Sequence, residues 1–167
     1  MEQPLAFEGS FSTELLQAVG ILFITCAAAE TVIGLQLIRV LSHPGIANTG
    51  ILPAISGMDV SVRLAVIRVR VAQIAPSCAP EISRITAKIQ NAFGHRNNIA
   101  HNFGHDGRSK NHIDLRSLRF NGDGSIQPNR TYDAKQIRTF SFLLQERLKG
   151  LDSALGAAGV LKLAELA

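Results

Sequence analysis

Two N-terminal segments carry apolar residues at the spacing of a helix. Residues 15–41 are apolar almost all round and follow Ser12 and Thr13, either of which can cap a helix. After a Gly-, Pro- and Asn-rich connection over residues 42–57, residues 59–75 again carry apolar positions three and four apart. This second segment also alternates as a strand does, so the pattern favours a helix there without excluding a strand.

Two later segments show the same helical period. A third helix is predicted from Pro80, with Gly94 interrupting its apolar stripe and Gly104 ending it. A last long helix is predicted to start at a cap, Thr131 or Asp133, and to run through residue 155. Gly156 or Gly159 would end this helix, and the tail to residue 167 is apolar enough for a short extra helix.

Between the third and last helices the pattern of apolar and polar residues changes from a helical period to alternation. An alternating run leads into Asn121-Gly122-Asp123-Gly124, and both Asn-Gly and Asp-Gly favour hairpin turns. Together the patterns predict an all-α, up-and-down bundle of four to five helices with a small β-hairpin insert near residues 113–131. We expect one domain over residues 1–167, with its core at about residues 12–155. The chain is 46% hydrophobic and contains no Trp, so aliphatic side chains must fill that core.

The most apolar segment was compared with a membrane span. Only twelve residues separate Gln17 from Glu30, whereas a span needs about 20 apolar residues. We therefore expect a soluble core helix, no membrane association and a cytoplasmic location, since no secretory signal is visible either. Cys26 and Cys78 lie in apolar surroundings and are expected to be reduced.

Positive charge is concentrated in one part of the chain. The net charge is +4, yet residues 84–119 hold seven basic and two acidic residues, an excess of five. Four of the five histidines also lie there: His95, His101, His105 and His112. Such a cluster is typical of proteins that bind a phosphate-rich partner, although a solvated surface gives the same composition.

The segment Arg96-Asn97-Asn98-Ile99-Ala100-His101 combines residue types suited to phosphodiester chemistry. On a helix, Asn97 and His101 share a face and Arg96 flanks it. An imidazole can move a proton at a ribose hydroxyl or a leaving oxygen, and a guanidinium can hold the phosphate. This chemistry requires no metal ion.

Arg96, four intervening residues and His101, with Asn97 directly after the arginine, resemble the motif of the HEPN superfamily. An arginine followed by a histidine after four to six intervening residues is expected about once by chance in this composition, so Asn97 supplies most of the specificity. The resemblance covers roughly residues 12–155 and includes a first helix with one internal carboxylate, Glu30. It implies a small helical bundle, a homodimer and metal-independent cleavage of RNA in toxin, defence or RNA-processing systems.

On this resemblance, His101 is the general acid and base, Arg96 clamps the phosphate and Asn97 orients them, with Glu30 supporting the site. RNA would be contacted by Lys88, His95, Arg108 and Lys110. No cofactor or metal is expected, and an antitoxin or another protein is a further partner that the family implies. Some such toxins carry a modifiable Tyr two residues after the motif histidine. Phe103 stands there, which argues against that form of control.

Two other interpretations remain. In the first, Arg96, Asn97 and His101 form a structural polar cluster or a nucleic-acid-binding surface in a catalytically inactive HEPN-like dimer. In the second, His101 and His105 hold a metal with other histidines, although Gly104 between them should end the helix.

Overall fold

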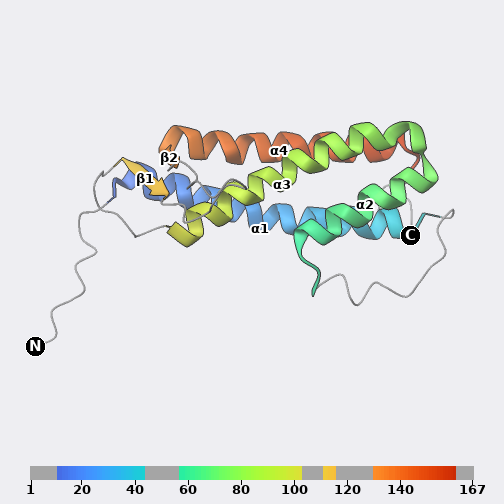
Figure 1. The fold of residues 1–167 in the computed structure, drawn as a ribbon, viewed down its shortest axis with the longest axis horizontal. Helices are drawn as coiled ribbons and strands as arrows, with labels where there is room; N and C mark the ends of the chain where they lie inside the picture. Colours follow the sequence, from blue (N-terminus) through green and yellow to red (C-terminus); the bar gives the residue numbers. More distant parts are fainter. Residues whose placement is uncertain (1–10, 44–56, 103–110, 116–129, 161–167) are drawn as a thin grey trace, which may run out of the picture.

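The computed structural model describes residues 11–43, 57–102, 111–115 and 130–160. Over these ranges the chain forms four long helices and a two-stranded antiparallel sheet (Figure 1). The helices are α1 (Thr13–Leu41), α2 (Val60–Ile74), α3 (Ala79–Asn102) and α4 (Ala134–Ala157). A 3-10 turn, η2 (Pro76–Cys78), joins α2 to α3, and the strands are β1 (His112–Leu115) and β2 (Arg130–Asp133). The predicted all-α bundle with a small hairpin is confirmed.

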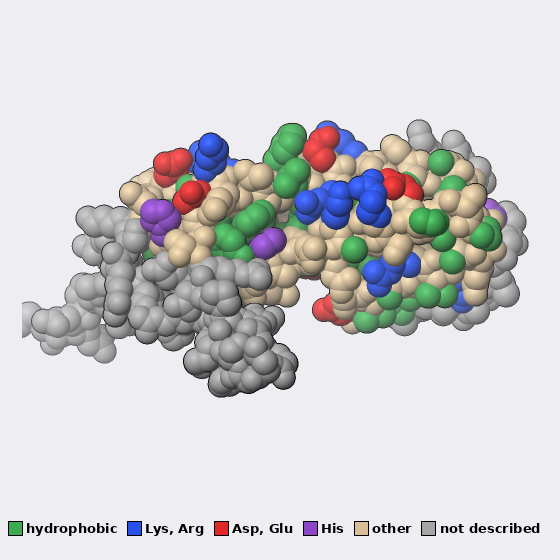
Figure 2. All heavy atoms as spheres, turned by 45° about the horizontal axis from the view of Figure 1, so that its top comes forward, with side chains coloured by type: hydrophobic (Ala, Val, Ile, Leu, Met, Phe, Trp, Pro, Cys, Tyr) green, Lys and Arg blue, Asp and Glu red, His purple; other side chains and the backbone are tan. Residues whose placement is uncertain are grey.

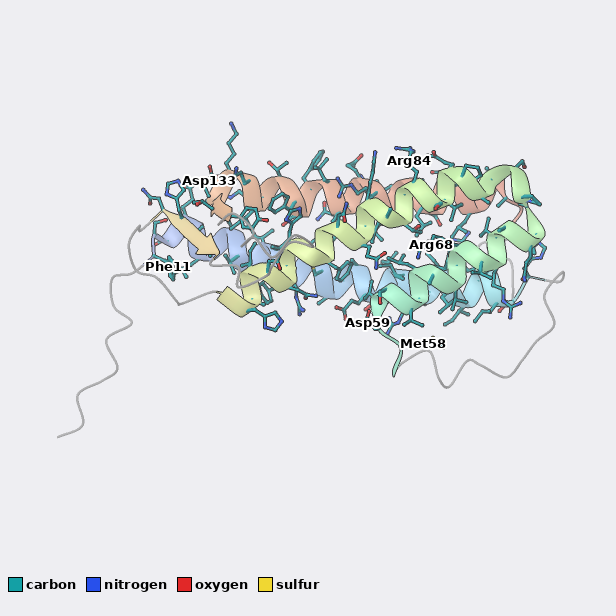
Figure 3. The ribbon with its side chains drawn as sticks, viewed as in Figure 1. Phe11, Met58, Asp59, Arg68, Arg84 and Asp133 are labelled. Atoms are coloured by element: carbon teal, nitrogen blue, oxygen red, sulfur yellow. The ribbon has the colours of Figure 1, made fainter. Side chains whose placement is uncertain are left out.

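Three helices begin at side-chain caps. The Ser12 hydroxyl accepts a hydrogen bond from the backbone N–H three residues on, at 3.3 Å. Asp59 caps α2, and Asp133 caps α4 in a capping box with Gln136 (Figure 3 labels both aspartates). These contacts satisfy N–H groups that the first turn of a helix leaves without partners. Of the alternative caps predicted from the sequence, Ser12 caps the first helix and Asp133 the last.

Two details of the predicted helices are settled. Residues 60–74 form a helix and not a strand, because Leu64, Ile67 and Val71 then share one face and are fully buried. Gly94 does not interrupt α3. It is exposed, while its neighbour Phe93 is buried, so packing outweighs the roughly 1 kcal/mol that a helical glycine costs.

Gly159 ends α4, as one of the two predicted stop positions. Its φ of +77° turns the chain so that the Val160 N–H reaches the Leu155 carbonyl at 3.0 Å, which is a Schellman arrangement. In the sheet, Ile113 pairs with Tyr132 and both are buried. The predicted turn at residues 121–124 and the predicted extra helix after residue 160 lie outside the described residues.

The bundle is built on α1, which packs most extensively against α4. The two helices run in the same direction, because Glu14 pairs with Arg138 at one end (3.2 Å) and Arg39 contacts Asp152 at the other. α3 runs in the opposite direction and α2 lies beside the C-terminal half of α1 (Figure 1). The core between them is almost entirely aliphatic, as the composition predicted.

A buried polar network fixes the far end of α1 and α4. The Arg39 side chain is only 5% exposed and donates to the Asp152 carboxylate, to Gln36 Oε1 at 2.5 Å and to the Val160 carbonyl at 3.2 Å. Gln36 in turn donates to Asp152 at 3.0 Å. One guanidinium thus joins α1, α4 and the turn that ends α4.

α1 is the one described helix that is long and apolar enough to cross a membrane by length and composition. A core helix of a soluble protein meets the same criterion. Here α1 contributes buried residues along its whole length, whereas several large apolar side chains on its other side are exposed: Leu16, Ile21, Ile24 and Leu35.

Candidate functional site

The motif predicted from the sequence occupies the last two turns of α3. Arg96 falls in the same row as Ile89 and Ile99, the row that packs into the bundle. Asn97 and His101 are one turn apart in a different row, and both are exposed. At about 100° per residue, the Arg96 and His101 side chains leave the helix axis roughly 140° apart. Asn97 and His101 therefore share a face, and Arg96 starts from another.

Arg96 is partly buried against α1. Its guanidinium carbon lies 5.0 Å from the centre of the Phe23 ring, a cation–π contact. Nη1 donates to the Asn97 side-chain oxygen at 2.9 Å, which turns one end of the guanidinium toward the face that carries His101. Nε is buried and has no hydrogen-bond partner among the described residues. A buried donor without a hydrogen bond lowers the stability of the folded protein, and functional sites often contain such groups.

α2 does not extend to the part of α1 that Arg96 contacts. The Arg63 Nη1 donates to the Glu30 carbonyl at 3.0 Å, which places the first turn of α2 beside Glu30. Phe23 lies almost two turns earlier on α1. Arg96 thus packs on α1 beyond the N-terminal end of α2, which accounts for its being partly exposed where its row-mates Ile89 and Ile99 are fully buried.

Cys26 and Glu30 lie near this guanidinium on α1. Burial raises the pKa of the Cys26 thiol to about 11; the Arg96 charge opposes that rise and the Glu30 charge adds to it. Both charges therefore act at the same buried sulfur atom. Within the described residues Glu30 forms no ion pair with Arg96, so the predicted supporting carboxylate is a neighbour of the site without a direct contact.

The raised pKa predicts an unreactive Cys26. At pH 8 we expect iodoacetamide to alkylate the partly exposed Cys78 and to leave Cys26 intact, because the thiolate is the nucleophile and Cys26 is 1% exposed. Mass spectrometry of tryptic peptides measures this, and alkylation in denaturant, where both cysteines should react, is the control. Equal labelling of the native protein at both positions would contradict the described packing.

His101 lies in the last turn of α3 and is exposed. It forms no hydrogen bond or ion pair with another described residue, so its ring is available to a bound molecule. Residues 103–110, which follow it directly, lie outside the described part of the chain. The predicted RNA contacts Arg108 and Lys110 lie in this range, as do Phe103 and His105.

His95 has a different environment from the one predicted. Its ring stacks on Phe140 with centroids 4.2 Å apart and planes at 2°, and Nδ1 lies 2.7 Å from the Tyr132 hydroxyl. This cluster joins α3, α4 and β2. Lys88 lies two turns earlier in the same row of α3, on the side away from Asn97 and His101. Lys88 and His95, the two predicted RNA contacts within the described residues, thus lie on the side of α3 away from Asn97 and His101.

Three aromatic residues that shape the site were not predicted: Phe23, Tyr132 and Phe140. Phe23 lies in an apolar run where nothing marks one residue as the contact of a later arginine. Tyr132 is the only tyrosine in the chain and directly follows the hairpin predicted near residues 113–131, which was the one available signal. Among the described residues no group of three or more His, Cys, Asp or Glu could hold a metal ion.

No family model, no curated protein and no solved structure matches the chain. The interpretation of the site therefore depends on its own geometry and on the motif.

Proposed function

We propose that this protein is a metal-independent endoribonuclease of the HEPN type. The observation that supports the proposal most is the condition of Arg96. This guanidinium is held by Phe23 and Asn97, has a buried Nε without a hydrogen-bond partner among the described residues and reaches toward the face that carries an exposed His101. The exposed part of this guanidinium can bind a phosphate oxygen, and a histidine near the phosphate could move the proton that the reaction requires.

The proposed reaction is cleavage by the 2′-hydroxyl of the RNA itself. His101 removes the proton from this hydroxyl, the oxygen attacks phosphorus, and the bond from phosphorus to the 5′-oxygen breaks. An imidazolium then returns a proton to that oxygen. The products are a 2′,3′-cyclic phosphate and a 5′-hydroxyl, and no oxidant, reductant or metal is consumed. Arg96 would bind the phosphate and stabilise its developing charge, and Asn97 would hold the guanidinium in place.

A homodimer would complete this site. Arg96 and His101 leave α3 in directions about 140° apart, so in a single chain they converge only as far as the arginine can reach around the helix. A second copy could supply the other member of the pair. The exposed apolar side chains of α1, such as Ile24 at 72% exposure, suit such a contact. The proposal includes a cytoplasmic location, RNA as substrate and an antitoxin or another protein chain as inhibitor.

A second candidate is a catalytically inactive dimer in which the same residues are structural. The contact of Arg96 with Phe23 favours it, because a guanidinium packed on a ring between two helices can fix their relative position. This candidate predicts that replacing Arg96 destabilises the protein, whereas the nuclease predicts loss of activity in a folded protein.

The test is cleavage of single-stranded RNA in excess EDTA. We expect the natural protein to cleave and His101→Ala to lose at least about a hundredfold in rate, because a positioned acid or base contributes roughly that much. His101 is exposed, so the melting temperature should not change. The matched control is His112→Ala, an exposed histidine on β1, which should retain full activity. Cleavage that disappears in EDTA, or survives in His101→Ala, would refute the proposal.

A further inference from the structure

A second charged surface lies between α3 and α4, in the half of α3 remote from the motif. Its groove has a volume of about 620 Å³. Ile85 and Gly150 meet at its floor, where the Cβ that Gly150 lacks would be 3.8 Å from the Ile85 side chain. Figure 2 shows basic side chains gathered on this face of the molecule, with acidic ones beside them.

The charges of this groove do not cancel. Glu81 is paired with Arg84 at 2.6 Å, and Glu146 is paired with Lys149 at 2.8 Å. The hydrogen bond from Arg84, followed by the charges of Arg84 and Lys88, lowers the pKa of Glu81, which therefore stays ionised and keeps its partner. Each of these two carboxylates is thus paired with a basic residue three positions away, and each pair carries no net charge.

Lys88 and Arg147 carry the remaining charge. Neither forms an ion pair with a carboxylate in the described part of the chain. Arg147 Nη1 on α4 donates to the Lys88 backbone carbonyl on α3 at 2.8 Å, and this bond holds the Arg147 guanidinium against α3 beside Lys88. The Lys88 side chain itself is exposed. Two cations from two helices are thus placed together, and the other Arg147 donors are left for a ligand.

We infer that Lys88 and Arg147 bind the phosphodiester backbone of an RNA strand in the groove between α3 and α4. The inference deepens the proposed function, on which it rests for the choice of RNA, by giving the substrate a contact away from the reacting phosphate. A guanidinium and an ammonium are the groups that phosphate oxygens prefer. None of the described residues that line the groove is aromatic, so no base can stack on them and the contact should be independent of sequence. Lys88 lies eight residues before Arg96, or about 12 Å along α3.

The test measures binding separately from cleavage. Fluorescence anisotropy of a labelled oligouridylate would be followed in the His101→Ala background, with and without Lys88→Ala and Arg147→Ala together. We expect affinity to fall on the order of tenfold, and the slope of log affinity against log salt to become shallower by about 1.4 for two lost phosphate contacts. The matched control is Lys135→Ala with Arg138→Ala, which removes two positive charges at the other end of α4. This control should change both the RNA affinity and the salt slope less than the Lys88/Arg147 double variant does.

Two further arms identify the ligand. Glu81→Gln should strengthen RNA binding, because it releases Arg84 from its carboxylate. Calorimetry with inorganic phosphate should detect no saturable binding, since a single phosphate gains only one of the contacts of a strand. Unchanged RNA affinity and salt slope in the Lys88/Arg147 double variant would overturn the inference, as would tight phosphate binding without an effect on RNA. If RNA binds here and the natural protein cleaves nothing, the groove stands and the nuclease proposal fails.

Discussion

Replacing Arg96 by methionine is expected to stop RNA cleavage without destabilising the protein. Methionine is unbranched and ends near the position of the arginine Nε, so it can still pack beside Phe23, and it removes a buried donor that has no partner among the described residues. The rate should fall by at least about a hundredfold, the usual loss for a group that stabilises transition-state charge. The free energy of unfolding should stay level or rise by about 1 kcal/mol, because the unsatisfied N–H is gone. Single-turnover kinetics and urea denaturation measure the two effects.

Arg63→Met is the matched control for stability. Arg63 donates to the Met58 carbonyl at 2.9 Å and to the Glu30 carbonyl at 3.0 Å, so its loss leaves partly buried backbone groups without those bonds. We expect the variant to lose about 2 kcal/mol of stability. If Arg96→Met is destabilised as much as Arg63→Met, Arg96 is a structural residue and the inactive dimer becomes the better interpretation.

The largest loss of stability is expected from Arg39→Ala. This change removes the contact with Asp152 and leaves the Val160 carbonyl and Gln36 without their donor. Arg39 is 5% exposed, and breaking a buried charge network by removing one member costs about 3–5 kcal/mol. Asp152 is 45% exposed, so we expect a value near the lower limit. Thermal and urea unfolding should both detect the loss, which is a large share of the stability of a domain.

Arg84→Ala provides the comparison for this network. Arg84 also contacts a carboxylate with two hydrogen bonds, but it lies in the exposed pair with Glu81 at the start of α3. Because solvent screens that pair, the melting temperature of Arg84→Ala should match that of the natural protein. Similar melting temperatures for Arg39→Ala and Arg84→Ala would show that the contacts of Arg39 contribute little.

The fold could largely be predicted because its helices are encoded locally. The cap at Asp133, the apolar row of Ile137, Leu144, Leu151 and Leu155, and the stop at Gly159 lie within one stretch of sequence. A helix of this kind needs no distant residue to define its buried face. The hairpin followed from alternation and turn residues, although the structure describes only its two paired ends.

The contacts that define the site are long-range and could not be predicted. Arg96 meets Phe23 seventy-three positions earlier in the chain, and His95 meets Phe140 forty-five positions later. Periodicity gives the face of a helix and not the helix that will cover it. It did place Arg96 and His101 in different rows of α3, and the two described residues expected to bind RNA, Lys88 and His95, lie on the side away from His101.

The account depends on Arg96 and His101 acting on one phosphodiester, and a double-mutant comparison of cleavage rates tests this most directly. Single-stranded RNA would be incubated in EDTA with the natural protein, Arg96→Met, His101→Ala and the double variant. Because residues that act as one unit lose their effect together, the double variant should be no slower than the slower single variant. Losses that multiply in the double variant, or a natural protein that leaves the RNA intact, would contradict the account.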